Sequence, residues 1–194
     1  MSPVSFGPSD VKNPNNLQYA HVPESFWVTK AILFDFDWIL REVSNPNRAM
    51  PDHRDIHSTL DGLKETFQLL RKFEIRLAIT SNLKQEAVIS ELSRLNLASD
   101  FDNIRCFEDA KELKPHSELH LFTMETLGVR PLKAVAFETT LEGVRAAKAS
   151  GVFCVGTPEL NGESDFHLDS LIEQPILILL EEIDRLKRQK FLKV

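Results

Sequence analysis

The chain has 194 residues, of which 42% are hydrophobic, so it is long enough to form one domain with a buried core. This composition excludes an intrinsically disordered tail and a small domain held together by disulfides. The net charge is −6 and no cluster of lysine and arginine is present, which argues against nucleic acid as a partner.

The chain begins with a segment, residues 1–26, that is rich in proline and asparagine and lacks apolar periodicity. This pattern predicts an N-terminal arm in front of a single domain over residues 27–194. The apolar run from Ala31 to Phe34 then predicts a strand buried on both faces of a parallel sheet. Residues 41–58 are polar and irregular, which predicts a connecting loop.

The rest of the chain alternates between short apolar runs and segments with helical spacing of apolar residues. The expected helices are residues 60–73, 88–95, 119–127, 141–150 and 171–190, and the further strands are residues 75–79, 104–107, 132–137 and 152–155. Strands that alternate with helices indicate parallel βαβ units, so we expect a three-layer α/β/α, Rossmann-like sheet. In such sheets the functional residues lie at the carboxyl ends of the strands.

Polar side chains stand at three of these strand ends. Asp35 and Asp37 follow the first strand, Ser81 and Asn82 follow the second, and Glu138 follows the fourth. Two carboxylates beside one pocket allow one to act as nucleophile or metal ligand while the other transfers protons. From the residues alone, aspartates after a strand are also typical of turns, and the pair Ser81-Asn82 is also typical of a helix cap.

Four segments in chain order resemble the motifs of one family. They are AILFDFDWIL at residues 31–40, LAITSN at residues 77–82, Lys114-Pro115, and AVAFETTLEGVRAAKASG at residues 134–151. Together they are similar to the haloacid dehalogenase (HAD) superfamily of aspartate-nucleophile hydrolases, in its phosphoglycolate phosphatase and β-phosphoglucomutase-like branch. The resemblance covers residues 30–156 and implies a HAD-like α/β fold.

The resemblance implies phosphoryl transfer through an aspartyl phosphate, in which Asp35 attacks phosphorus and Asp37 protonates the leaving alcohol and then activates water. Ser81 and the backbone amide of Asn82 would bind the phosphoryl oxygens, and Lys114 would neutralise the nucleophile and the phosphate. Mg²⁺ would bridge the phosphate and Asp35, with the Asp37 carbonyl as a further ligand. A lysine before proline is also typical of a solvated loop, so the role of Lys114 stays open.

Two residues depart from the family's pattern at the site. Trp38 stands where a glycine normally follows the second aspartate, so the local turn or the pocket must differ. Thr139 stands where an aspartate normally holds the metal, and a neutral hydroxyl is a weaker ligand for Mg²⁺ than a carboxylate. Glu138 and Glu142 are candidate replacement ligands, although Glu142 also suits a surface position at the start of a helix. We therefore expect a weakened Mg²⁺ site.

The spacing of the motifs bears on the cap domain of this branch. Asp35 and Ser81 stand 46 positions apart, which leaves no room for a full helical cap. We expect a cap that is absent or reduced to residues 41–58, in which Arg41 is a candidate contact for an anionic substrate. An exposed polar loop is the alternative interpretation of this segment. In the family, an open site goes with macromolecular substrates or with a partner subunit that closes the pocket.

These observations lead to two hypotheses. The first is a HAD-type phosphatase that hydrolyses a phosphate monoester of a small molecule or a macromolecule, with a weakened Mg²⁺ site. The alternative is a catalytically impaired domain that acts as a binding or regulatory module. The expected partners are the phosphorylated substrate and an oligomer or partner protein that closes the open site.

Three further features are less specific. Cys106 and Cys154 lack the spacing of a metal site or a disulfide framework, so we expect inert core thiols in a reducing cytoplasm. No apolar stretch approaches the ~20 residues of a membrane span, and the N-terminus lacks a signal pattern, so we expect no membrane partner. We expect His120 to be a partly exposed helix residue.

Overall fold

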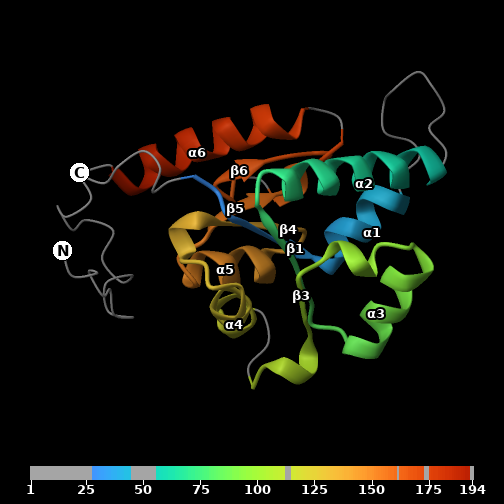
Figure 1. Ribbon diagram of the computed structural model, residues 1–194. Helices are drawn as coiled ribbons and strands as arrows, with labels where there is room; N and C mark the ends of the chain where they lie inside the picture. The colour runs from blue at the N-terminus through green and yellow to red at the C-terminus, as the bar shows by residue number, and fades with distance from the viewer. Residues whose placement is uncertain (1–27, 45–55, 112–114, 161, 173–174, 193–194) are drawn as a thin grey trace, which may run out of the picture.

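The computed structural model describes residues 28–44, 56–111, 115–160, 162–172 and 175–192. Six strands form one sheet in the order β3-β2-β1-β4-β5-β6, and neighbouring strands run parallel (Figure 1). The strands are β1 (Ala31–Asp35), β2 (Arg76–Thr80), β3 (Asn103–Arg105), β4 (Ala134–Glu138), β5 (Phe153–Gly156) and β6 (Phe166–His167). The predicted parallel α/β sheet is confirmed.

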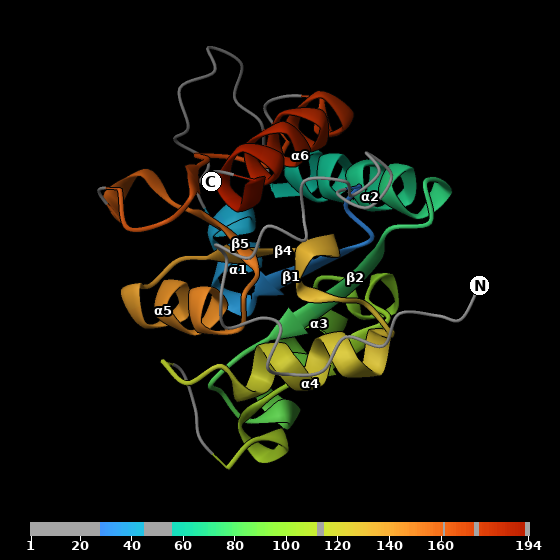
Figure 2. The ribbon, with the colours of Figure 1, turned by 90° about the vertical axis from the view of Figure 1, so that its left-hand side faces the viewer.

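Helices cover both faces of this sheet. They are α1 (Phe36–Ser44), α2 (Ile56–Lys72), α3 (Gln85–Arg94), α4 (Glu118–Leu127), α5 (Leu141–Ala149) and α6 (Ile176–Leu192). Figures 1 and 2 show α2 and α6 on one side of the sheet and α4 and α5 on the other. The three-layer architecture is therefore also confirmed. No helix in the described part of the chain is long and apolar enough to cross a membrane.

The central strands are buried on both faces, and alternate side chains enter two separate cores. Ile32 and Phe34 point into the core on the side of α2 and α6. Ala31 and Leu33 point into the core on the side of α4 and α5. This alternation follows from the two-residue period of a strand. The same period places Asp35, the last residue of β1, on the side of α4 and α5.

The chain passes from β1 into α1 without an intervening turn, because Phe36 is already the first helical residue. Trp38 therefore has no need of the conformational freedom of glycine. Its indole is fully buried and lies edge-on against the ring of Phe137, with 5.1 Å between the centroids. The local turn therefore differs from the family's pattern, as Trp38 led us to expect, and position 38 belongs to a packed helix.

Three other boundaries differ from the sequence-based expectation. The predicted loop 41–58 overlaps the end of α1 and the start of α2, and its middle, residues 45–55, lies outside the described residues. The predicted arm over residues 1–26 also lies outside the described residues. The last helix begins at Ile176 rather than at Leu171, directly after Pro175, whose ring fixes a helical φ. Strand β6 was not predicted, since two residues are too few to show a period.

Helix α6 is fixed to the start of β1 by a buried polar cluster. Asp184 accepts hydrogen bonds from the backbone N and Oγ1 of Thr29, at 3.1 and 2.7 Å. The ammonium of Lys187 donates to Thr29 Oγ1 and to Asp184 Oδ1, each at 3.0 Å, and its side chain is fully buried. Burial lowers the pKa of Lys187, although the carboxylate of Asp184 opposes this shift.

Candidate functional site

Asp35 lies at the point where the strand order reverses. The chain leaves β1 toward β2 on one side, whereas β4 pairs with β1 on the other side. In open parallel sheets the carboxyl edge at this position is where ligands bind. The Asp35 side chain is 6% exposed, and its Oδ2 accepts a hydrogen bond of 2.6 Å from the hydroxyl of Thr139.

The last residues of three neighbouring strands form a polar row on the side of α4 and α5. Asp35 pairs with Thr80 across the sheet, and Glu138 directly follows Phe137, the partner of Phe34. Thr80 and Glu138 are fully buried. The hydroxyl of Thr80 has no hydrogen-bond partner among the described residues. A buried hydroxyl of this kind is typical of a place where a water molecule or a ligand completes the structure.

The carboxylate of Glu138 is held by a histidine from α4. Its Oε1 lies 2.8 Å from Nε2 of His120, and neither side chain has exposed surface. A Cβ at position 143 would collide with Oε2 of Glu138, so a residue larger than glycine there would displace this carboxylate. The expectation of a partly exposed His120 is wrong, because the side chain lies on the inner face of α4. The signal that was missed is a histidine in line with apolar helix positions, which needs a buried partner.

The segment after β2 is bonded to its surroundings without capping α3. The backbone N of Ser81 donates to the carbonyl of Arg105 at 3.0 Å, and its Oγ accepts from the backbone N of Leu83 at 3.1 Å. Lys84 is the N-cap residue of α3 and makes no side-chain cap. The alternative in which Ser81 and Asn82 cap this helix is therefore wrong. Ser81 is buried at the carboxyl edge of β2, and Asn82 is exposed.

Two other predicted site residues are exposed, and a third lies outside the described residues. Asp37 is exposed in the first turn of α1. Glu142 is exposed in the first turn of α5, as its surface interpretation requires. Lys114 lies outside the described residues.

The described side chains do not fit a preassembled Mg²⁺ site. Among them, no group of three or more histidine, cysteine, aspartate or glutamate side chains is arranged to hold a metal ion. Asp35 Oδ2 accepts from Thr139, and Glu138 Oε1 is bonded to His120. Mg²⁺ requires near-octahedral oxygen ligands, of which carboxylates are the strongest that proteins supply. The substitution at position 139 thus removes a charge where the ion would need one.

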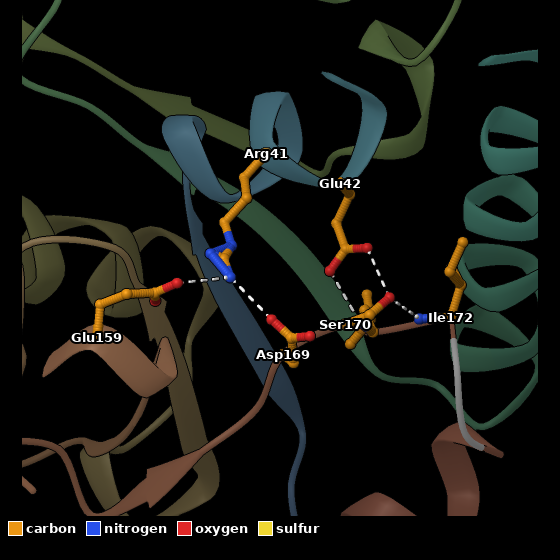
Figure 3. A network of polar contacts seen from close by, with 7 residues as sticks. Arg41, Glu42, Glu159, Asp169, Ser170 and Ile172 are labelled. Carbon is orange, nitrogen blue, oxygen red and sulfur yellow. Dashed lines mark hydrogen bonds and ion pairs between the residues drawn. The ribbon is translucent and has the colours of Figure 1, made fainter. Parts of the chain in front are cut away.

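Arg41, a candidate contact for an anionic substrate, is engaged in ion pairs (Figure 3). Its Nη2 donates to Asp169 Oδ1 at 2.8 Å and to Glu159 Oε1 at 3.3 Å. The next residue, Glu42, is buried and accepts hydrogen bonds from Ser170 Oγ at 2.9 Å and from the backbone N of Leu171 at 2.8 Å. This network attaches the segment after β6 to α1.

The two cysteines are buried, as expected. Burial raises the pKa of the Cys106 thiol to about 12 and places that of Cys154 well above its usual value. Since the thiolate is the reactive form, neither thiol is suited to nucleophilic chemistry.

Comparison of the sequence with known proteins identifies the family of this chain. Residues 39–157 match the family described as haloacid dehalogenase-like hydrolase. The chain is 29% identical over 129 residues to a protein named putative phosphatase YhcW from Bacillus subtilis, covering 63% of this chain and 59% of that protein. It is 34% identical over 91 residues to phosphorylated carbohydrates phosphatase from Thermotoga maritima, covering 47% of this chain and 42% of that protein. The chain thus spans about half the length of these relatives.

Solved structures share the fold. β-Phosphoglucomutase from Clostridium difficile superposes with a TM-score of 0.62 at 16% identity, covering 81% of this chain and 98% of that one. CbbY from Rhodobacter sphaeroides, in complex with phosphate, superposes with a TM-score of 0.55 at 23% identity, covering 75% and 96%.

Proposed function

Since the chain belongs to the haloacid dehalogenase-like hydrolase family, we propose that it is a phosphatase that hydrolyses a phosphate monoester with Asp35 as nucleophile. The observation that carries this proposal is the buried Asp35 carboxylate at the reversal point of the sheet, held by Thr139. The names of the relatives as phosphatases support the same reaction class.

In this proposal the hydrogen bond from Thr139 fixes the plane of the Asp35 carboxylate, so that one oxygen is presented to phosphorus. The carboxylate oxygen bonds to phosphorus as the ester P–O bond breaks, and Asp37 gives its proton to the leaving alcohol. Asp37 then accepts a proton from water, whose oxygen attacks phosphorus and releases Asp35 and inorganic phosphate. Exposure of Asp37 in the first turn of α1 suits proton exchange with solvent.

Ser81 and Asn82 are the proposed donors to the phosphoryl oxygens, from the loop after β2. Mg²⁺ is the cofactor that the family resemblance implies, and we expect this chain to bind it weakly. The reason is that position 139 supplies a hydroxyl and that Glu138 is bonded to His120. We propose a phosphorylated small molecule or macromolecule as substrate, in the cytoplasm, with a partner protein or a second copy closing the site.

Hydrolysis of p-nitrophenyl phosphate by wild type, Asp35→Asn and Asp61→Asn tests this function. Asparagine keeps the shape of the side chain and can still accept from Thr139, but it is not a nucleophile. We expect Asp35→Asn to lose activity at least about 1,000-fold. Asp61 is exposed on α2, so Asp61→Asn serves as the matched control and should match wild type. Equal rates in all three proteins would refute Asp35 as nucleophile, and no hydrolysis above background by wild type would leave the alternative, a binding or regulatory module.

A further inference from the structure

Two large apolar side chains remain half exposed at the carboxyl edge of the sheet. Leu83, in the loop after β2, and Phe107, two residues beyond β3, are each 47% exposed. The backbone N of Phe107 donates to the carbonyl of Leu83 at 3.0 Å. The loops that follow β2 and β3 are therefore joined at these two residues, and each contributes one apolar side chain to the surface.

This pair is directly connected to the proposed phosphate-binding serine. The backbone N of Leu83 donates to Ser81 Oγ at 3.1 Å, and the backbone N of Ser81 donates to the carbonyl of Arg105, at the end of β3. A phosphoryl group bound at Ser81 therefore has Leu83 and Phe107 on the side of β2 and β3. An organic group that extends from this phosphoryl group toward β2 and β3 would contact the pair.

Two carboxylates beside the pair are engaged within the protein. Glu108 Oε2 accepts from the backbone N of Gln85 at 3.0 Å. Asp109 accepts from Arg105 Nη1 at 2.7 Å and from the backbone N of Cys106 at 2.8 Å. The pair therefore offers apolar surface to a ligand, next to the exposed side chain of Lys84.

We propose that Leu83 and Phe107 form a subsite for an apolar organic group of the substrate. This inference rests on the proposed phosphatase function and narrows its substrate class to aryl or longer alkyl phosphate monoesters. Covering the two exposed side chains removes apolar surface from water, which favours such ligands. If a ligand buries about 50 Å² of apolar surface at this pair, its affinity should be roughly eightfold higher than that of a ligand without this contact.

Binding of two phosphonates, measured by calorimetry, tests the subsite without turnover, because their P–C bond is not hydrolysed. We expect wild type to bind phenylphosphonate about five- to tenfold more tightly than methylphosphonate. Leu83→Ser and Phe107→Ser should each reduce this ratio and leave the affinity for methylphosphonate unchanged, which also shows that the variants are folded. Phe73→Ser is the matched control, since Phe73 is 51% exposed near the start of β2, at the opposite edge of the sheet.

Equal affinities of wild type for the two ligands, or a preference that persists in both variants, would overturn the inference. A dimer in sedimentation experiments that Leu83→Ser dissociates would also overturn it, because a second copy would then cover the pair. Failure of the proposed function is distinguishable from these outcomes. In that case hydrolysis would be absent while the preference for phenylphosphonate, and its loss in the two variants, remained.

Discussion

The hydroxyl of Thr139 donates a hydrogen bond of 2.6 Å to Oδ2 of Asp35, at the carboxyl edge where β1 and β4 meet. A residue that breaks the family's pattern thus contacts the candidate nucleophile directly. The hydroxyl orients the carboxylate but brings no charge for a cation. The same contact therefore supports Asp35 as nucleophile and predicts weak binding of Mg²⁺.

The first prediction concerns Thr139→Asp. A second carboxylate beside Asp35 should raise the affinity for Mg²⁺ about tenfold or more, because carboxylates are the preferred protein ligands of this ion. Without Mg²⁺ the two like charges should lower the melting temperature, and added Mg²⁺ should restore it. Calorimetry and thermal unfolding measure the two effects. The control Thr139→Asn introduces a side chain of nearly the same shape as aspartate but without its charge. An equal gain in Mg²⁺ affinity in this control would contradict the explanation.

The second prediction concerns the buried pair of His120 and Glu138. Replacing His120 by leucine leaves a buried carboxylate without this partner and should reduce the free energy of unfolding by about 3 kcal/mol. The double variant His120→Leu/Glu138→Gln removes the buried charge as well, so its free energy of unfolding should fall less than that of the single variant. Denaturant unfolding of both proteins tests this order. A single-variant loss below about 1 kcal/mol would contradict a tightly bonded pair.

The sequence was sufficient to locate the strands that carry the site. Continuous apolar runs mark strands buried on both faces, and β1, β2 and β4 lie within two residues of the predicted positions. Asp35 and Ser81 could therefore be placed at the carboxyl edge in advance. The substitution at position 139 was also visible, since it breaks a motif.

The contacts of the site could not be predicted, because they join residues far apart in the chain. The bonding of His120 to Glu138 depends on how α4 lies on β4, which the periodicity of either element does not determine. Helix α1 was missed because its second half belongs to the polar, irregular segment 41–58 that predicted a loop, whereas burial of Trp38 against Phe137 favours a helix.

The third prediction concerns the pH dependence of stability at Lys187. Burial lowers the pKa of this ammonium in the folded protein below its ordinary value of 10.5. Between the lowered pKa and 10.5 the unfolded chain binds more protons at this position, so Lys187 makes the free energy of unfolding rise with pH there. Lys187→Met removes this contribution. The free energy of unfolding of wild type, measured with denaturant, should therefore rise relative to that of the variant as pH rises toward 10.5. A difference between the two proteins that does not change with pH would contradict the lowered pKa of Lys187.

The fourth prediction separates two neighbouring residues of α1. Arg41 pairs with the exposed carboxylates of Glu159 and Asp169, so Arg41→Ala should cost less than about 1 kcal/mol. Glu42 is buried and accepts from Ser170 and Leu171, so Glu42→Ala should cost about 2 to 3 kcal/mol, because both donors lose their partner. Urea unfolding compares the two variants. The reverse order of their effects would show that the exposed ion pairs, rather than Glu42, hold the segment after β6.

The central claim is that Asp35 forms a covalent bond to phosphorus, and trapping that intermediate tests it most directly. The reaction with p-nitrophenyl phosphate is quenched in acid during turnover, and the peptide that contains Asp35 is examined by mass spectrometry. The account predicts one phosphoryl group on Asp35 in wild type and none in Asp35→Asn, which should also be inactive. Turnover by wild type with no phosphoryl group on Asp35, or turnover that persists in Asp35→Asn, would contradict it.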